Sequence, residues 1–413
     1  MLKILHFADA HIDMANYGKH DPESGLPMRV IDFLKSLDEI IATAIDEKVD
    51  MVIFAGDTYK NRTPAPTFQR EWGKRMIQLS RAGITTLLLT GNHDISPATG
   101  RAHAIQEFDT LEVPNIHVID TPVFLKPEQL EGLPVQVLAL PWISRSGLIA
   151  SQEMEGADRK QVYEEINDRL STLINNWLNA ADPNLPIILT AHASVEGAKY
   201  GAERLVILGN DFTLPPALVK DKRLDYVALG HIHKAQDLNE GSQPPVIYPG
   251  SIERVDFGEV QDKKYFVLAE VGKGNTTVDW RELKNIRQFL DISLNLESDQ
   301  GINQRLQQAL PPQSEIKDAI IRMVITYPRE WESLIDETGL RNLTSESFEF
   351  HLVKRSLAEA RVRLPEGRTA GSLSKIELLD IYWDATHREL ETGKRTVLNQ
   401  LAKEIIDGVE SGV

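Results

Sequence analysis

The stretch DYVALGHIHKAQ, residues 225–236, runs through apolar residues, stops at Gly230 and then places two histidines one residue apart. On an extended chain, side chains two positions apart point to the same side, so His231 and His233 face one way. Two imidazoles at this spacing suit a metal ion and are unusual for packing. The stretch therefore predicts a buried strand that carries metal ligands at its carboxyl end.

The same pattern, an apolar run that ends in polar residues, recurs along the first two thirds of the chain. The runs are KILHFAD (3–9), DMVIFAGD (50–57), ITTLLLTGNHD (84–94), IILTAH (187–192), YVALGHIH (226–233) and VIYPGS (246–251). Near-continuous apolar runs are typical of strands buried on both faces. Residues 29–48 and 158–181, which lie between runs, repeat apolar residues at helical spacing. Alternating strands and helices predict a layered α/β core over residues 1–285.

A second region follows this core. Residues 289–295, 319–327 and 347–354 have the pattern of strands, with helical patterns between them. They predict a small α/β domain over residues 286–360. Residues 361–373 have the composition of a linker, and the last residues predict two helices, the first opening with a capping box at Ser374 and Glu377. The tail, residues 361–413, is thus a linker and a helical segment with an apolar stripe at Val397, Leu401, Ile405 and Val409.

The amino-acid composition limits the classes of protein and of metal site that this chain can form. The chain has 413 residues, 42% of them hydrophobic, which is enough for more than one packed domain. It contains no cysteine, so any metal must be held by nitrogen and oxygen ligands. The formal net charge of -16 argues against a broad basic surface for nucleic acid. Without a signal-peptide pattern or a long apolar stretch, we expect a cytoplasmic protein.

The polar clusters at the predicted strand ends are chemically alike. Parallel strands of an α/β sheet place their carboxyl ends at one edge, so these residues can meet although they are far apart in sequence. Carboxylate, amide and imidazole groups suit Mn²⁺, Mg²⁺, Fe²⁺ or Zn²⁺. Seven candidate ligands are too many for one ion and suit two ions about 3.5–4 Å apart that share a carboxylate. The candidates are Asp9, His11, Asp57, Asn92, His192, His231 and His233.

The ordered set DxH, GD, GNHD, H and GHxH resembles the calcineurin-like metallophosphoesterase superfamily over about residues 1–285. The resemblance implies a four-layer α/β/β/α sandwich. It also implies that one ion is held by Asp9, His11, Asp57 and His233, and the other by Asp57, Asn92, His192 and His231. In that pattern Asp57 bridges the ions, His93 faces the substrate phosphate and Asp94 orients His93.

A further resemblance extends over nearly the whole chain. The motif YPGSIERVDFGE (248–259) is similar to the nuclease subunits of SbcCD-type DNA repair complexes. It implies a Mn²⁺-dependent exonuclease and endonuclease at DNA double-strand ends, a DNA-capping role for residues 286–360, and a tail that grips an SbcC-like coiled-coil ATPase. It also implies a homodimer and no membrane partner. The chain departs from this family after Asp57, where an apolar pair and a second Asp are common but Thr58, Tyr59 and Lys60 stand.

Several alternatives stay open at this level. One is an enzyme that hydrolyses a small phosphodiester or a phosphomonoester such as a phosphoprotein, and another is a non-catalytic scaffold that binds DNA. Arg254, Lys199 and Arg204 are candidate DNA contacts, and each is equally compatible with a structural ion pair. Packing inside its own domain is the alternative for the apolar stripe of the tail, but its place beyond a linker favours docking to a partner. Six other histidines have no partner motif and are expected to be ordinary residues: His6, His20, His103, His117, His351 and His387.

Overall fold

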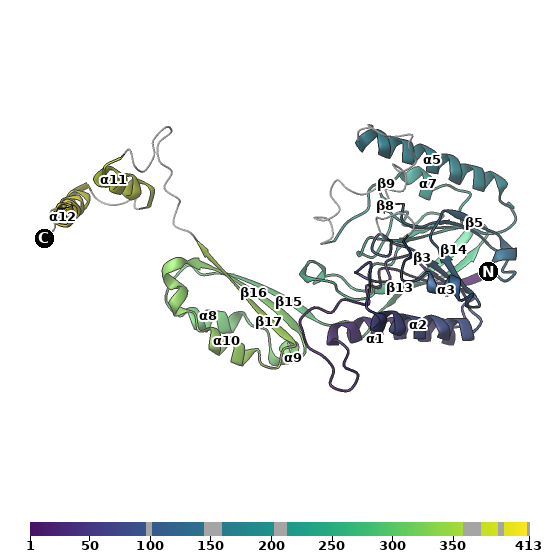
Figure 1. Ribbon diagram of the computed structural model, residues 1–413, viewed down its shortest axis with the longest axis horizontal. Coiled ribbons are helices and arrows are strands. Elements are labelled where there is room, and N and C mark those ends of the chain that lie inside the picture. Colours follow the sequence, from purple (N-terminus) through teal and green to yellow (C-terminus); the bar gives the residue numbers. More distant parts are fainter. Residues whose placement is uncertain (96–100, 144–158, 202–212, 358–372, 387–391, 411–413) are drawn as a thin grey trace. The chain divides into compact units, whose positions relative to one another are not determined.

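The computed structural model describes residues 1–95, 101–143, 159–201, 213–357, 373–386 and 392–410. The chain forms two units, Met1–Phe289 and Leu290–Val413, which are described one at a time (Figure 1). Arg204, His387 and nearly all of the predicted linker lie outside the described residues.

The first unit contains two six-stranded sheets. One has the order β14-β13-β1-β2-β3-β4, in which β1 to β4 are parallel and β13 and β14 are antiparallel neighbours. Its strands are β1 (Leu2–Phe7), β2 (Met51–Phe54), β3 (Thr85–Leu89), β4 (Ile116–Ile119), β13 (Tyr265–Gly272) and β14 (Asn275–Glu282). Because β1, β2 and β3 are parallel neighbours, the loops after them lie at one edge of this sheet.

The second sheet has the order β11-β12-β10-β7-β6-β5. Its inner strands β12, β10, β7 and β6 are parallel, and the two outer strands are antiparallel to their neighbours. The strands are β5 (Val123–Leu125), β6 (Gln136–Leu140), β7 (Ile187–His192), β10 (Tyr226–Gly230), β11 (Gln236–Asp237) and β12 (Val246–Tyr248). Strands β7 and β10 pair in register up to His192 and Gly230, so their polar ends are adjacent.

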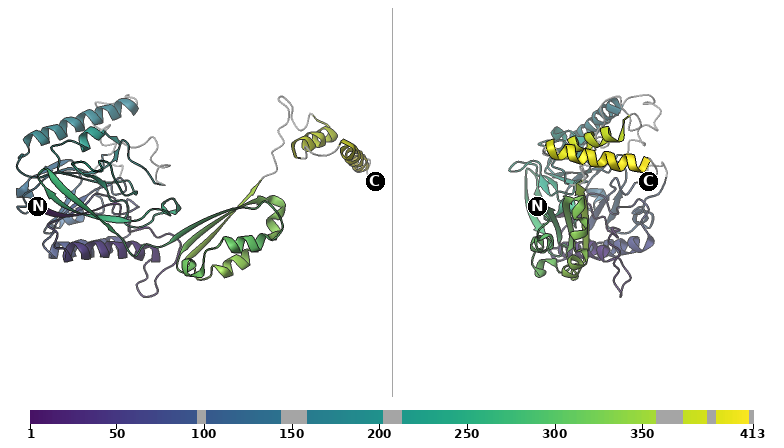
Figure 2. Two further views of the ribbon diagram at one scale, coloured as in Figure 1. Left: turned by 180° about the vertical axis from the view of Figure 1, so that it is seen from behind. Right: turned by 90° about the vertical axis from the view of Figure 1, so that its left-hand side faces the viewer.

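Three apolar cores hold these layers together. The helices α1 (Met28–Asp46) and α2 (Pro66–Arg81) pack on the first sheet, and α5 (Arg159–Ala180) packs on the second. A third core, with Ile53 from one sheet and Ala228 from the other, fills the space between the sheets. Figures 1 and 2 show α1 and α2 on one side of the two sheets and α5 on the other. The predicted four-layer α/β/β/α sandwich is confirmed.

Several elements of the first unit carry no polar cluster, and the sequence patterns did not predict them. They include α2, the strands β4, β5 and β6, and the hairpin of β13 and β14. Short elements complete the unit: α3 (Glu107–Thr110), α7 (Pro216–Val219), β8 (Ser194–Val195) and β9 (Thr213–Leu214). The observed strands are shorter than the apolar runs from which they were predicted, because the polar residues at the end of each run belong to the following loop.

The second unit begins with a three-stranded sheet of order β15-β16-β17, in which β16 and β17 are parallel. The strands are β15 (Phe289–Asn295), β16 (Ile320–Pro328) and β17 (Glu349–Leu357), and the helices are α8 (Ile302–Ala309), α9 (Gln313–Ile316) and α10 (Glu337–Leu343). A core that includes Leu306, Met323 and Leu340 joins the helices to the sheet. These elements form a small two-layer α/β fold, with helices packed on a three-stranded sheet.

Two helices follow, α11 (Lys375–Thr386) and α12 (Thr392–Glu410). The predicted capping box is present, because the amide of Glu377 donates to Ser374 Oγ at 3.2 Å and the amide of Ser374 donates to Glu377 Oε2 at 2.7 Å. The helices contact each other where Arg395 pairs with Asp380 at 3.0 Å. Among the described residues, no helix has the length and apolar content to span a membrane.

Candidate metal centre

The loops after five parallel strands meet at one place in the first unit. The amide of Asp9 donates to Gly56 O at 3.0 Å, which joins the loop after β1 to the loop after β2. The amide of His231 donates to Asp9 Oδ1 at 3.0 Å, which joins β10 of the second sheet to β1 of the first. Hydrogen bonds between loops therefore bring the polar ends of the two sheets together.

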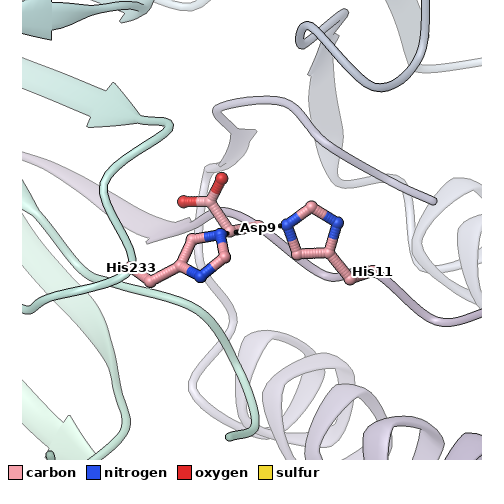
Figure 3. Close-up of side chains that lie close together, drawn as sticks. All are labelled: Asp9, His11 and His233. Atoms are coloured by element: carbon pink, nitrogen blue, oxygen red, sulfur yellow. Dashed lines mark hydrogen bonds between the residues drawn. The ribbon is translucent and has the colours of Figure 1, made fainter. Parts of the chain in front are cut away.

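Three of the predicted ligands form a first group: Asp9, His11 and His233. Each is buried, and each offers a ligand atom within 4.8 Å of the other two. The Nε2 atoms of His11 and His233 are only 3.1 Å apart, and Figure 3 shows the carboxylate of Asp9 beside the two rings. Donor atoms that converge in this way can bind one cation.

The other predicted ligands form a second group around Asn92. Its Oδ1 lies 3.1 Å from His192 Nε2 and 2.9 Å from His231 Nδ1. His192 Nε2 in turn lies 3.5 Å from Asp57 Oδ2. The side chains of Asp57, His192 and His231 are buried, whereas that of Asn92 is half-buried. The group is therefore accessible from the protein surface at the side-chain amide of Asn92.

Asp57 lies between the two groups. Its Oδ2 is 3.8 Å from His11 Nε2 and 3.5 Å from His192 Nε2, while its Oδ1 accepts the amide hydrogen of His93 at 2.9 Å. Asp57 also groups with Asp9 and His192 as a possible three-ligand set. This position is the one that a shared carboxylate requires, although its bridging role stays a prediction.

The chemistry of these groups fits divalent cations. Within the described part of the chain, neither Asp9 nor Asp57 has a lysine or arginine within ion-pair distance, and His11 Nδ1 has no hydrogen-bond partner. Burial raises the pKa of the Asp9 carboxyl and lowers the pKa of the His11 imidazole. Burial alone would raise the pKa of Asp57 too, but the imidazole of His192 and its neighbours hold that pKa well below its usual range. Among the described residues, the only basic groups beside the two carboxylates are thus imidazoles, which are the usual companions of carboxylates in metal sites.

The backbone at this place is strained. Four candidate ligands have positive φ angles, which residues other than glycine rarely adopt: Asp9 (52°), His11 (39°), Asp57 (63°) and His231 (97°). Two glycines allow the loops to approach, because a Cβ on Gly91 would lie 2.0 Å from Asp57 Oδ1 and one on Gly230 would lie 2.1 Å from Ala55 O. Such strain concentrates at functional sites, where surrounding structure holds it in place.

His93 and Asp94 follow Asn92 in the same loop. The ring of His93 donates from Nδ1 to Lys60 O at 2.8 Å, and its Nε2 accepts from Lys60 Nζ at 3.4 Å. The carboxylate of Asp94 accepts from the amides of Asp57 at 2.9 Å and Gly91 at 2.9 Å. Lys60 therefore orients the ring of His93, and Asp94 orients the loop that carries it.

A comparison with protein families matches the calcineurin-like phosphoesterase model to residues 2–235, more than half of the chain. The chain belongs to the calcineurin-like phosphoesterase family. It is 28% identical over 286 residues to SbcD, the D component of the nuclease SbcCD of Escherichia coli K12, covering 66% of each chain. It is 34% identical over 321 residues to the DNA double-strand break repair protein Mre11 of Haloferax volcanii, covering 78% of this chain and 60% of that one.

It is also 27% identical over 290 residues to an uncharacterized metallophosphoesterase, YhaO, of Bacillus subtilis strain 168, covering 69% of this chain and 61% of that one. The matches thus span slightly less than two thirds of these curated relatives. Family membership identifies the chain as a metal-dependent hydrolase of phosphate esters.

Two residues near this phosphoesterase centre were not predicted as site residues. Glu259 accepts a hydrogen bond from His233 Nδ1 at 2.8 Å, and a carboxylate in that position fixes the ring of a metal-binding histidine. Its only sequence signal was its place as the last residue of the YPGSIERVDFGE motif. Trp142, which follows β6, has its ring centroid 5.1 Å from that of His231.

The candidate DNA contacts have different surroundings. The guanidinium of Arg254 donates to the backbone carbonyls of Glu259, Arg287 and Asp262 at 3.2, 2.9 and 3.1 Å, which is a structural role. Lys199 is exposed, and its backbone pairs with the side chain of Gln236. Arg204 lies outside the described residues. Contact of any of the three with DNA stays a prediction.

Proposed function

We propose that the chain is the nuclease subunit of an SbcCD-type repair complex, which hydrolyses phosphodiester bonds at DNA double-strand ends. The observation that carries this proposal is the convergence of seven candidate metal ligands, Asp57 and six side chains near it, from five strand ends. The similarity to SbcD and Mre11 proteins supports DNA as the substrate.

The ligands would hold two divalent ions, of which we favour Mn²⁺. Asp9, His11, Asp57 and His233 would bind one, and Asp57, Asn92, His192 and His231 the other. When bound, such ions would neutralise phosphate oxygens and lower the pKa of a bound water molecule. Glu259 and the carbonyl of Ala55, which accepts from His192 Nδ1 at 2.7 Å, keep two of the imidazoles in the required orientation.

His93 is the proposed proton donor. Because Nδ1 keeps its proton in the hydrogen bond to Lys60 O, Nε2 can donate only when the ring is doubly protonated. It would then give its proton to a non-bridging phosphate oxygen or to the departing 3′-oxygen. The ring lies edge-on to His11, with 5.3 Å between the ring centroids, so Nε2 belongs to the same polar pocket as the first ligand group.

The second unit would supply the partner contacts. The small α/β layer of residues 290–357 is proposed to cap DNA. Three residues of the predicted apolar stripe are exposed on α12, and the side chain of Val409 lies outside the described residues. We propose the exposed apolar residues of α12 as the docking surface for an SbcC-like coiled-coil ATPase: Val397, Leu398, Leu401 and Ile405. We also propose a homodimer, as in that family.

A hydrolysis assay tests the proposal directly. Purified protein is given linear duplex DNA, single-stranded DNA and bis-p-nitrophenyl phosphate, with and without Mn²⁺ and with and without the ATPase partner. We expect Mn²⁺-dependent cleavage of DNA. Activity toward small phosphoesters alone would indicate another phosphoesterase, and DNA binding without cleavage would indicate a scaffold.

A matched variant isolates the role of His93. His93→Ala should retain its Mn²⁺ while turnover falls by roughly 10²–10⁴-fold, the usual contribution of a positioned general acid. Wild-type turnover by this variant would remove His93 from the mechanism, and a loss of bound Mn²⁺ would make it a metal-site residue instead.

A further inference from the structure

A surface cavity lies next to the loops that carry the candidate metal ligands. It has a volume of about 590 Å³ and is lined by residues 62–64, by Gln69 of α2, and by residues 101–104, 106–107 and 110–111 around α3. None of the predicted metal ligands lines it, so it is distinct from the metal centre.

Arg62 joins the cavity to the metal centre. Its side chain lines the cavity, and its Nη2 donates to the backbone carbonyl of Asn92 at 3.5 Å. Lys60, two residues earlier, places its Nζ 3.4 Å from His93 Nε2. Positive charge therefore continues from the catalytic histidine into the cavity.

The cavity also contains a second arginine that has no acidic partner. Arg62 and Arg101 are both exposed, and within the described ranges neither forms an ion pair, whereas Arg29, Arg75 and Arg287 do. In a chain of net charge -16, two such guanidinium groups around one hollow indicate an anionic ligand. Glu107 is the acidic residue of the lining, and the two arginines outnumber it.

We propose that this cavity binds the phosphate next to the scissile one on the same nucleic-acid strand. The proposal rests on the proposed nuclease function and narrows its substrate to a polymer with consecutive phosphates. Arg62 stands at the wall nearest Asn92, and Arg101 belongs to the other segment of the lining. Guanidinium groups suit this task because their paired N–H donors match two phosphate oxygens.

Two variants test the cavity, Arg62→Ala and Arg101→Ala. Each is compared with wild type on a thymidine oligonucleotide and on bis-p-nitrophenyl phosphate, which has no neighbouring phosphate. We expect kcat/KM for the oligonucleotide to fall about tenfold more than kcat/KM for the small diester, as loss of one charged contact predicts. Arg62→Lys and Arg101→Lys should recover part of the loss. Arg70→Ala, an exposed arginine of α2 paired with Glu71, should change neither value.

Binding of a fluorescent oligonucleotide in EDTA provides a readout that needs no turnover. Each alanine variant should bind more weakly and should lower the slope of log K against log salt by about 0.7, the value for one phosphate of a single strand. Unchanged oligonucleotide affinity, or equal losses on both substrates, would overturn the cavity proposal. If wild type hydrolysed neither substrate, the nuclease function would fail, while the binding result would still decide the cavity.

Discussion

The buried polar residues of the first unit fall into two groups that differ in how their charge is balanced. In the group around Arg29, Asp32 accepts from Arg29 at 2.8 Å and from Arg287 Nη2 at 2.7 Å. In the metal centre, the carboxylates of Asp9 and Asp57 have histidines beside them and no lysine or arginine within the described residues. The first group is balanced by guanidinium groups, and the second is a set of carboxylates and imidazoles that could hold a metal ion.

Glu259 combines both kinds of environment. Its Oε2 pairs with Lys264 Nζ at 2.7 Å, and its Oε1 accepts from His233 at 2.8 Å. Burial alone would raise the pKa of Glu259, but the buried lysine and the imidazole hold that pKa far below its usual range. Buried charges thus occur both in the structural group around Arg29 and in the metal centre. What distinguishes the metal centre is that, within the described residues, only imidazoles and no lysine or arginine lie beside its carboxylates.

The most severe loss should follow when the metal centre is broken. Asp57→Asn removes the carboxylate that both ions would share, so activity should fall by at least roughly a thousandfold, equivalent to several kcal/mol of transition-state stabilisation. The free energy of unfolding of the metal-free protein should also fall at neutral pH. Burial alone would raise the pKa of Asp57, but His192 and its neighbours hold that pKa well below its usual range, and asparagine cannot keep this charge interaction. Kinetics on DNA and urea unfolding in EDTA measure the two effects, and wild-type turnover by the variant would remove Asp57 from the metal centre.

A smaller loss should follow when the balanced group is broken. Arg29→Met leaves Asp32 and Glu253 buried with one cation fewer, which should lower the free energy of unfolding by roughly 3–5 kcal/mol. Chemical denaturation in EDTA measures it. Arg169→Met, in an exposed pair with Glu165 on α5, is the control and should change stability by less than about 0.5 kcal/mol. If Arg29→Met also changed the free energy of unfolding by less than about 0.5 kcal/mol, its ion pairs would contribute no more than an exposed surface pair.

Glu259→Gln tests the residue that combines the two environments. Loss of the carboxylate that orients His233 should weaken Mn²⁺ binding by about 10–100-fold, measured by calorimetric titration. Glu253→Gln is the matched control, because Glu253 is equally buried and hydrogen-bonds the amide of Arg254 rather than a candidate ligand. Equal Mn²⁺ affinity for the two variants would assign Glu259 a purely structural role.

The last effect is absent at neutral pH, appears only in acid, and concerns a buried residue that avoids charge altogether. Burial lowers the pKa of His6 to about 3, and its Nδ1 pairs with the hydroxyl of Tyr226 at 3.0 Å. Because the unfolded state binds a proton below about pH 6.5 and the folded state does not, stability from His6 is present above that pH and is lost as pH falls toward 3. Between about pH 6 and 4 the loss should be about 1.4 kcal/mol per pH unit.

The measurement is the unfolding free energy of wild type and His6→Phe across that range. Subtraction of the two curves cancels the other titrating groups, and a difference that does not change with pH would rule out a neutral His6.

Much of the site was predictable because its signals are local. Asp57, His192 and His231 each lie at or just beyond the end of a buried apolar run, and strand direction alone places those ends at one edge. The strands β5 and β6 were missed because they are short and end in no polar cluster. Arg254 was ambiguous in sequence, since an arginine next to a turn has the same pattern whether it binds DNA or backbone carbonyls.

Local sequence was sufficient to predict the kinds of ligand, their spacing within each motif and the layered α/β core, because alternation along a strand and the position of its end are properties of short segments. Which charges are balanced could be learned only from the folded chain. Glu259 lies 26 residues beyond His233, and the cavity arginines come from two separate segments. Such contacts depend on how loops pack across two sheets, and no spacing along the chain encodes them.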